Sequence, residues 1–316
     1  MWITVILCTY NRCSTLAKAL ESLALESLPD SDEWEVLVVD NNSVDKTREV
    51  VEEFCCRYPG RFRYLFESRQ GKSNALNAGI REARGDILAF ADDDVTAEPM
   101  WLRNLTAALR DNDLAGAGGR ILPHWTCAPP RWLPSEGRYA SAPFALFDLG
   151  LKAGPLAEPP FGTNMAFRKA MFEKYGGFRT DLGPCPGSEI RGEDTEFGRR
   201  LLAGGEQLWY EPSAVVYHPV PENRLVKRYH LAWWYDKGRA DIREVGIPRN
   251  GLRCKGVPLC LFRRLARWTL QWMIEVRRAQ RFEAKMKLWG IRGAIAECCN
   301  ELLATKRQVV ERKLSP

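Results

Sequence analysis

Three consecutive aspartates, Asp92, Asp93 and Asp94, form the densest group of carboxylates in the chain. They follow the mostly apolar run Asp86–Ala91, which predicts a buried strand, and Val95–Pro99 then opens a helical pattern. Adjacent carboxylates repel one another, and burial strengthens the repulsion. A divalent cation that prefers oxygen ligands would offset it, and Mg²⁺ commonly brings substrate phosphates with it. A solvated acidic turn that caps the next helix is the competing interpretation of the triplet alone.

The elements that must position this triplet alternate between short apolar runs and helical patterns, which is typical of βαβ units and a parallel sheet. Parallel strands end at the same edge of a sheet, so the turns that follow them should line one crevice. The expected strands are Trp2–Cys8, Trp34–Val39, Phe62–Phe66, Asp86–Ala91, one within Leu114–Ile121, Gly162–Arg168, Leu208–Tyr210 and Ala214–Tyr217. The expected helices are one capped by Ser14, one capped by Asp45 that ends near Tyr58, one that ends at Ala83, Glu98–Leu109, Lys169–Tyr175, and one from Glu193 to Ala203.

Polar residues follow three other expected strands. Asp40 can accept hydrogen bonds from a nucleobase or a ribose, and its alternative role as a helix cap is better filled by Asp45. Arg69, Gly71 and Lys72 precede a helix N-terminus, where positive charge and the helix dipole suit an anion. A basic surface turn is the alternative for these three residues. Their spacing is not that of a P-loop.

A second acidic pair, Glu193 and Asp194, opens a later helix. A helix N-terminus orients a carboxylate and keeps it ionised, so this pair is a candidate for a general base. A capping pair with Glu196 is the competing interpretation. His218 follows an expected strand and precedes Pro-Val-Pro, and a lone histidine of this kind is more often structural.

The composition is that of a globular protein, with 45% hydrophobic and 27% charged residues among 316. The length leaves room for one large α/β domain and a smaller element. No basic segment precedes Met1–Cys8, which favours a first strand over a signal peptide. The ten cysteines show no CxxC or zinc spacing, which favours reduced thiols in a cytoplasmic protein.

The proline-rich stretch Pro123–Phe161 interrupts the alternation of strands and helices. It holds eight prolines together with Trp125, Trp132 and Tyr139. A long irregular segment inside a compact domain is usually functional or mobile.

Six stretches together resemble the family 2 glycosyltransferases, in the same order and with similar spacing across residues 2–222. They are Thr9–Arg12, Val39–Ser43, Gly71–Asn77, Asp92–Asp94, Gly162–Asn164 and Gly192–Asp194. The resemblance implies the GT-A fold of nucleotide-diphospho-sugar transferases, an α/β, Rossmann-like and mostly parallel sheet flanked by helices. It implies a catalytic domain over residues 1–225, with 123–161 as its irregular acceptor-side segment, and a basic, mainly helical extension over 226–316.

The same resemblance implies an inverting, metal-dependent transfer from a nucleotide-diphospho-sugar, with a UDP-sugar favoured, to a hydroxyl of a glycan or a lipid-linked acceptor. Asp194 is then the general base. Donor contacts fall on Thr9, Tyr10, Asn11, Arg12, Asp40, Asn42, Arg69, Gly71, Lys72, Asn74, Asp92 and Asp93. Acceptor-side residues are Gly162, Thr163, Asn164 and Glu193. Mg²⁺ or Mn²⁺ is expected on Asp94, with Asp92 beside it on the ribose or on a water of the metal, because alternate side chains of an extended segment can share a target. His218 is the third expected metal ligand, since some relatives contact the metal or the diphosphate with a histidine at this place.

Two other functions compete with this interpretation. A nucleotidyltransferase that makes nucleotide-sugars shares the broad fold, but it normally carries a Gly-rich loop near the first strand, which Thr9–Arg12 does not provide. A non-catalytic relative that binds sugar nucleotides would not need intact Asp92, Asp94 and Asp194. Release of a nucleoside diphosphate separates these cases.

Positive charge is concentrated in the C-terminal tail. The net charge of the chain is +6, whereas residues 261–316 hold thirteen Lys or Arg and five Glu, a net charge of +8. Apolar residues there recur at helical spacing, and basic side chains flank them. We therefore expect peripheral, salt-sensitive binding to an anionic inner membrane face, with no nucleic-acid partner. The alternative is that the stripe packs on the catalytic domain. The apolar stripe is Leu261, Leu265, Trp268, Trp272 and Val276, and the arginines are Arg263, Arg264, Arg267, Arg277, Arg278 and Arg281.

Overall fold

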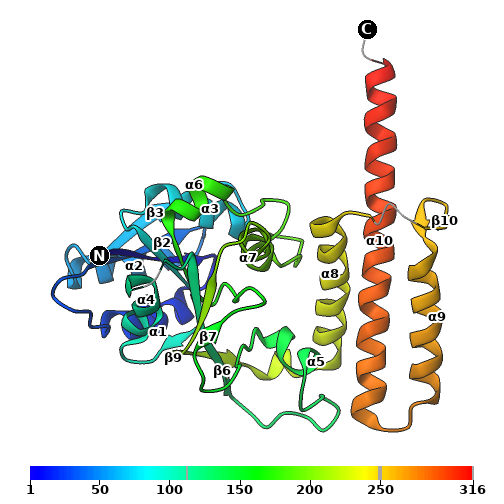
Figure 1. Cartoon of the computed structure of the whole chain (residues 1–316), viewed down its shortest axis with the longest axis horizontal. Coiled ribbons are helices and arrows are strands. Elements are labelled where there is room, and N and C mark those ends of the chain that lie inside the picture. The colour runs from blue at the N-terminus through cyan, green and yellow to red at the C-terminus, as the bar shows by residue number, and fades with distance from the viewer. Residues whose placement is uncertain (112, 248–250, 315–316) are drawn as a thin grey trace. The chain divides into compact units, whose positions relative to one another are not determined.

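The chain forms two compact units in a computed structural model (Figure 1). The structure describes residues 1–111, 113–247 and 251–314. Side chains are described for all of these residues except 111 and 304–314. Unit 1 comprises Met1–Thr126, Phe144–Ser188 and Glu193–Val220. Unit 2 comprises Cys127–Pro143, Glu189–Gly192 and Pro221–Pro316. The proline-rich stretch is thus divided between the two units.

Unit 1 is an α/β sandwich in which helices cover both faces of a mixed sheet. Within the described residues, nine strands form this sheet, in the order β3-β2-β1-β4-β8-β6-β9-β5, with β7 paired to β9. The strands are β1 (Trp2–Thr9), β2 (Glu33–Asp40), β3 (Phe62–Phe66), β4 (Ile87–Asp92), β5 (Thr96–Ala97), β6 (Gly116–Trp125), β7 (Gly154–Pro155), β8 (Asn164–Arg168) and β9 (Leu208–Val220). The helices are α1 (Cys13–Ala24), α2 (Thr47–Arg57), α3 (Lys72–Glu82), α4 (Trp101–Asp111), α6 (Lys169–Tyr175) and α7 (Glu193–Ala203).

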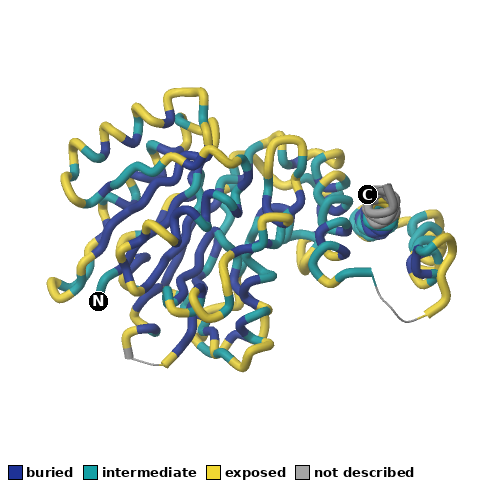
Figure 2. The backbone as a smooth tube through the Cα atoms, turned by 90° about the horizontal axis from the view of Figure 1, so that it is seen from above, coloured by how far each residue is buried: buried dark blue, intermediate teal, exposed yellow. Residues whose placement is uncertain are grey.

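Two hydrophobic layers hold these helices against the sheet, because alternate residues of each buried strand point to opposite faces. Val5 and Val38 face α1, α2 and α4, where Leu20 and Trp101 are buried. Ile6, Leu37 and Phe90 face α3, α6 and α7. Figure 2 shows most of the strands of this sheet as buried. The near-continuous apolar runs in the sequence therefore correspond to strands covered on both sides.

The four strands β3, β2, β1 and β4 are parallel, as the alternation of strands and helices predicted. β8 enters antiparallel between β4 and β6, so the sheet is mixed. Ala91 at the end of β4 pairs with Asn164 at the start of β8. The stretch Gly162–Asn164 therefore lies at the same edge as the C-terminal ends of the parallel strands, although its own strand runs the other way.

Several local predictions were wrong for identifiable reasons. The stretch Val95–Pro99 does not open a helix, because Thr96 and Ala97 pair with β9 and α4 starts only at Trp101. The two short strands expected within residues 208–217 form one strand, β9. Ser14 does not cap α1, which begins at Cys13, and Asp45 accepts the Cys13 N–H instead at 3.0 Å. Asp45 also accepts the Thr47 N–H at the start of α2, but the N-cap residue of this helix is Lys46, so Asp45 lies one residue before the cap position that was predicted for it.

Glu26 holds the start of α4, a contact that the sequence did not reveal. Its carboxylate accepts the backbone N–H groups of Trp101 and Leu102, each at 3.1 Å. Burial raises the pKa of Glu26 from 4.5 to about 7, despite these two hydrogen bonds. The ionised form is therefore disfavoured in the folded protein, and stability should fall as the pH rises from about 4.5 through about 7.

We expect Glu26→Gln to remove this pH dependence. Between pH 5 and pH 8 the natural protein should lose on the order of 2 kcal/mol of unfolding free energy relative to the variant. Denaturant unfolding at several pH values measures the difference. Glu21→Gln, on an exposed position of α1, changes the same charge and should keep the natural pH dependence. Parallel pH curves for natural protein and Glu26→Gln would contradict the prediction.

Unit 2 consists mainly of three helices, α8 (Lys227–Val245), α9 (Leu259–Ile274) and α10 (Arg278–Leu314). Both α8 and α9 pack against α10 (Figure 1). Gly238 on α8 and Gly293 on α10 permit close approach of these two helices, because a β-carbon at either would collide with the backbone of the other helix. The short elements are α5 (Arg138–Ser141), the 3-10 turns η1 (Ala142–Phe144) and η2 (Glu222–Arg224), and the hairpin β10 (Arg253–Cys254) with β11 (Val257–Pro258).

The apolar stripe of the basic tail is only partly a continuous surface. Leu261, Leu265 and Trp268 join a cluster with Ile242 and Ile291 of unit 2, so this part packs within the chain. Val276 lies beyond the end of α9 and is exposed. No helix among the described residues combines the length and the apolar character needed to span a bilayer.

Candidate active site

The turns predicted to line one crevice do meet at one edge of the sheet. In the parallel register, Thr9 pairs with Asp40, and Cys8 pairs with Asp92. The ends of β1, β2 and β4 therefore lie side by side, and the polar residues that follow these strands are brought together. The sequence predicted this arrangement because each of the three strands ends in a polar turn.

Asp92 is held by two partners from different elements. Lys72, the first residue of α3, donates to its Oδ1 at 2.5 Å, and the hydroxyl of Thr163 donates to its Oδ2 at 2.7 Å. Burial alone would raise the pKa of Asp92, but Lys72 and Thr163 outweigh burial and hold the pKa well below its usual range. Burial would likewise lower the pKa of Lys72, but the negative charges of Asp92 and Glu193 raise it. Both groups are therefore charged at neutral pH.

Arg12 offsets the charge of the other two aspartates of the triplet. Its Nη1 lies 3.0 Å from Asp93 Oδ1 and 2.9 Å from Asp94 Oδ2. Burial raises the pKa of Asp93 to about 6, with Arg12 opposing the shift and Asp94 adding to it. The repulsion within the triplet is thus compensated by two cations of the protein itself. The sequence did not reveal these pairings, although it placed all five residues at the site.

Three side chains could share a divalent cation. Asp92, Asp94 and His218 each offer one ligand atom, and these atoms lie within 4.8 Å of one another. His218 Nε2 is 3.6 Å from Asp94 Oδ1. Two carboxylate oxygens and an imidazole nitrogen suit Mn²⁺, and the oxygens also suit Mg²⁺. The three side chains therefore fit the divalent metal that the sequence predicted. His218 belongs to β9.

Hydrogen bonds connect the turns after β1 and β2, which are the turns predicted to contact the nucleotide. Asp40 is buried, and it accepts the Ser43 N–H and the Tyr64 hydroxyl, each at 2.9 Å. Asn11, in a left-handed conformation with φ 51°, donates its N–H to Ser43 and accepts the Val44 N–H through its side chain. These bonds fix the backbone beside Asp40. Tyr10 and Asn42 remain exposed at this edge.

The turn before α3 is shaped by Asn41, whose role the sequence analysis did not assign. The Asn41 amide donates to the carbonyl oxygens of Glu67 and Arg69 and accepts the Gly71 N–H at 2.8 Å. Gly71 has φ +124°, a conformation that disfavours side chains. Arg69 makes two bonds to Glu67, at 3.0 and 2.7 Å, so its guanidinium is already engaged. Asn74 donates to the carbonyl oxygen of Gln70. In the sequence, the position of Asn41 directly after Asp40 in the same turn could have indicated that Asn41 has a role at this site.

Asn164, predicted on the acceptor side, is used inside the protein. It is buried, accepts the indole N–H of Trp101 at 2.8 Å, and donates to the carbonyl oxygens of Arg120 and Ala214. Both of its amide hydrogens are therefore occupied. Asn164 fixes the start of β8, which in turn places Gly162 and Thr163.

Asp194 stands in the first turn of α7, where two backbone N–H groups orient its carboxylate. Gly162 donates to Oδ2 and Thr195 donates to Oδ1, each at 2.6 Å. Its neighbour Glu193 is buried, and burial together with the charge of Asp194 raises the pKa of Glu193 to about 7. Of the two acidic residues, Asp194 is the more exposed.

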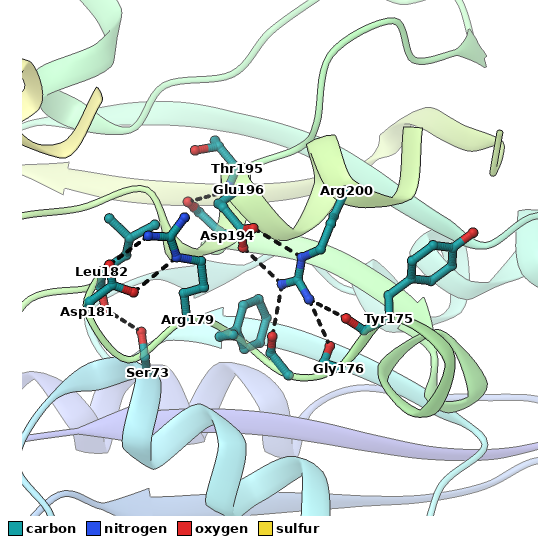
Figure 3. Close-up of polar contacts among 12 residues, drawn as sticks. Ser73, Tyr175, Gly176, Arg179, Asp181, Leu182, Asp194, Thr195, Glu196 and Arg200 are labelled. Atoms are coloured by element: carbon teal, nitrogen blue, oxygen red, sulfur yellow. Dashed lines mark hydrogen bonds and ion pairs between the residues drawn. The ribbon is translucent and has the colours of Figure 1, made fainter. Parts of the chain in front are cut away.

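Figure 3 shows how Arg200 connects α7 to the turn that follows α6. Arg200 pairs with Glu196 one turn earlier and also donates to the carbonyl oxygens of Tyr175 and Gly177. Ser73 on α3 donates to the carbonyl oxygen of Leu182 at 2.7 Å. The Glu196 carboxylate is therefore bound by Arg200, whereas the Asp194 carboxylate accepts the Gly162 N–H.

The sequence profile of Glycosyl transferase family 2 matches residues 4–176, more than half of the chain. Succinoglycan biosynthesis protein ExoM of Rhizobium meliloti is 30% identical over 256 residues, which cover 79% of this chain and 77% of ExoM. Glycosyltransferase AglE of Haloferax volcanii is 27% identical over 254 residues, which cover 80% of this chain and 77% of AglE.

Among solved structures, the mannosyltransferase PcManGT from Pyrobaculum calidifontis, in complex with GDP-Man and Mn²⁺, has a similar fold. The TM-score is 0.57 at 21% sequence identity, and the match covers 97% of this chain and 79% of that one. This likeness confirms the GT-A fold that the motifs predicted. The profile match and the similarity to ExoM establish that the chain belongs to glycosyl transferase family 2.

Proposed function

We propose that this transferase moves a sugar from a nucleotide-diphospho-sugar to a hydroxyl group of a glycan or a lipid-linked acceptor, with inversion at the anomeric carbon. The observation that carries the proposal is the pair of consecutive residues Gly162 and Thr163. The Gly162 N–H binds Asp194, and the Thr163 hydroxyl binds Asp92. A carboxylate able to accept a proton and a carboxylate able to bind metal are thereby held by one short segment.

The donor side rests on Asp40, Thr9 and the exposed Tyr10 for the base and ribose. Lys72 and Arg12 supply two positive charges that suit the diphosphate, once the diphosphate replaces their present carboxylate partners. PcManGT is in complex with GDP-Man, which supports a donor of this class. A UDP-sugar is the first donor to test, and the name of ExoM, a succinoglycan biosynthesis protein, supports a glycan product.

Asp92, Asp94 and His218 would hold the Mg²⁺ or Mn²⁺. When bound, the metal supplies a Lewis acid for the departing diphosphate. The Mn²⁺ of PcManGT supports this assignment. Thr163 keeps the Asp92 carboxylate oriented, and β8 fixes Thr163 through the buried Asn164.

Asp194 is the proposed general base. Its two backbone hydrogen bonds hold the carboxylate still, and its partial exposure allows an acceptor hydroxyl to approach. Removal of the hydroxyl proton activates the oxygen for attack on the face opposite the leaving group. A single displacement of this kind inverts the anomeric carbon.

We further propose that unit 2 attaches this transferase to an anionic membrane surface on the cytoplasmic side. The exposed apolar residues Leu270, Met273, Ile274 and Val276 lie among basic residues of α9 and α10, which supports the proposal. Binding of this type depends on buried apolar area and on attraction to anionic lipid, so it should weaken in salt.

The transfer reaction is tested with a panel of UDP- and GDP-sugars, each with Mn²⁺ or Mg²⁺. A true donor should raise the unfolding free energy by about 2.7 kcal/mol at 100 times its Kd. With a hydroxyl acceptor, the protein should then release a nucleoside diphosphate, and the product should have the inverted anomeric configuration by NMR. Pyrophosphate release from a nucleoside triphosphate and a sugar phosphate would instead identify a nucleotidyltransferase. Donor binding without any release would identify a binding protein.

A further inference from the structure

A cationic pocket lies in unit 2 among the first turns of α8 and α10 and the last turn of α9. Its volume is about 430 Å³, within the usual range for pockets that bind small molecules. Five basic residues line it, and no acidic residue does. They are Arg131, Lys227, Arg278, Arg281 and Lys285. Lys227 and Arg278 are the first residues of α8 and α10, whose helix dipoles add to the positive potential. Figure 1 shows α8, α9 and α10 side by side.

The five basic side chains of this pocket make no ion pair with any residue that the structure describes. The nearby carboxylates are engaged elsewhere, because Glu275 pairs with Arg277 at 3.2 Å and Glu283 pairs with Lys287 at 2.6 Å. Five uncompensated positive charges around one pocket repel each other. An anion that carries more than one negative charge would relieve this repulsion, and a phosphate group does so with several acceptor oxygens.

Aromatic rings form the remaining wall of the pocket and contact three of its basic side chains, Lys227, Arg281 and Lys285. Trp132 and Phe282 pack edge to face, with centroids 4.7 Å apart. Lys227 Nζ lies 5.7 Å from the Trp132 ring, and Lys285 Nζ lies 5.6 Å from the Trp272 ring. These contacts place the ammonium groups over the faces of aromatic rings. The pocket is therefore preformed by the chain itself.

An exposed apolar surface continues from the pocket along the chain. Trp272 lines the pocket, and Leu270, Met273 and Ile274 beside it in α9 are 60%, 63% and 62% exposed. Val276, two residues before the start of α10, is 86% exposed. A soluble phosphate compound would leave these side chains in water, whereas the acyl region of a lipid would cover them.

We propose that this pocket binds the phosphorylated head group of an anionic lipid, with the exposed end of α9 inserted beside it. The proposal rests on the membrane attachment proposed above and adds a defined head-group site to it. It does not depend on the transfer reaction. A phosphomonoester head group fits best, because its terminal phosphate carries nearly two charges and is open to several basic side chains at once.

The test uses flotation of the intact protein with phosphatidylcholine vesicles that contain either phosphatidate or phosphatidylserine, at matched surface charge. We expect at least roughly tenfold tighter binding to the phosphatidate vesicles. Arg278→Gln/Arg281→Gln should reduce this preference to about one, because the two residues contact the head group only in the pocket. Arg263→Gln/Arg264→Gln removes the same charge from exposed positions of α9 outside the pocket, and it should preserve the preference.

A calorimetric titration without vesicles separates a lipid from a soluble phosphate. Dioctanoyl phosphatidate, below its micelle concentration, should bind at least roughly tenfold more tightly than inorganic pyrophosphate. Met273→Gln/Ile274→Gln should abolish this advantage and leave pyrophosphate binding unchanged. Equal affinity for the two probes, with no vesicle preference, would overturn the lipid assignment in favour of a soluble ligand. A preference that survives Arg278→Gln/Arg281→Gln would overturn the pocket assignment. Donor binding by unit 1 should stay unchanged in every variant, so failure here is distinct from failure of the transfer proposal.

Discussion

Replacing Asp194 with asparagine is expected to lower kcat roughly 10²- to 10⁴-fold, which is the usual contribution of a general base. The asparagine oxygen can still accept the Gly162 N–H, so the start of β8 should stay in place. The neutral amide is too weak a base to remove a proton from the acceptor hydroxyl. The KM for the donor should change by less than about threefold, because the donor contacts lie on other turns. Steady-state kinetics with a fixed acceptor measure both values.

Glu196→Gln is the matched control for this prediction. Glu196 lies in the same helical turn as Asp194, and its substitution removes the same charge. Its carboxylate pairs with Arg200 and not with Gly162. Its kcat should stay within about threefold of the natural value. Glu193→Gln tests the neighbouring carboxyl group. A larger loss of kcat in Glu193→Gln than in Asp194→Asn would transfer the role of base to Glu193.

Asp94→Ala is expected to remove most of the transfer activity, on the order of 100-fold or more, because one ligand of the metal is lost. Asp94 is not part of the hydrophobic core, so its loss should leave the packing around β4 and the fold intact. Binding of Mn²⁺, followed by electron paramagnetic resonance, should weaken in parallel and gives a readout independent of activity. Excess chelator should inactivate the natural protein to a similar extent.

The control for this second prediction lies at the other end of the same strand. Asp86 precedes β4 and is exposed, and its side chain makes no hydrogen bond that the structure describes. Asp86→Ala should therefore keep both Mn²⁺ binding and activity. Full activity of the natural protein in chelator would exclude a metal on Asp92, Asp94 and His218.

The sequence predicted where the site residues lie better than it predicted what they contact. Asp40 and Asp92 could be placed together because each follows a buried run at the end of a parallel strand, and that pattern depends only on local periodicity. The bond from Lys72 to Asp92 depends on how the turn before α3 is shaped, and Asn41 determines that shape from another strand. The spacing of residues within one segment therefore cannot predict a contact of this kind.

Pairings between distant segments were missed for the same reason. The insertion of β8 as an antiparallel strand depends on Asn164, whose partners Arg120 and Ala214 are far away in the sequence. Thr96 and Ala97 looked like the start of a helix because β9, their partner, comes more than a hundred residues later. Close packing of α8 on α10 requires Gly238 to lie against Gly290 and Gly293 to lie against Tyr235, and neither glycine alone indicates this in the sequence.

The ion pairs of the aspartate triplet have a consequence for selectivity. Lys72 and Arg12 already neutralise the carboxylates, so a bare cation must compete with them, and a bare anion must compete with the carboxylates. A cation that arrives together with a diphosphate would replace both sets of partners at once, since the cation would bind the aspartates and the diphosphate would bind the two basic side chains. We therefore expect this edge of the sheet to bind a cation together with a diphosphate more tightly than it binds either ion alone.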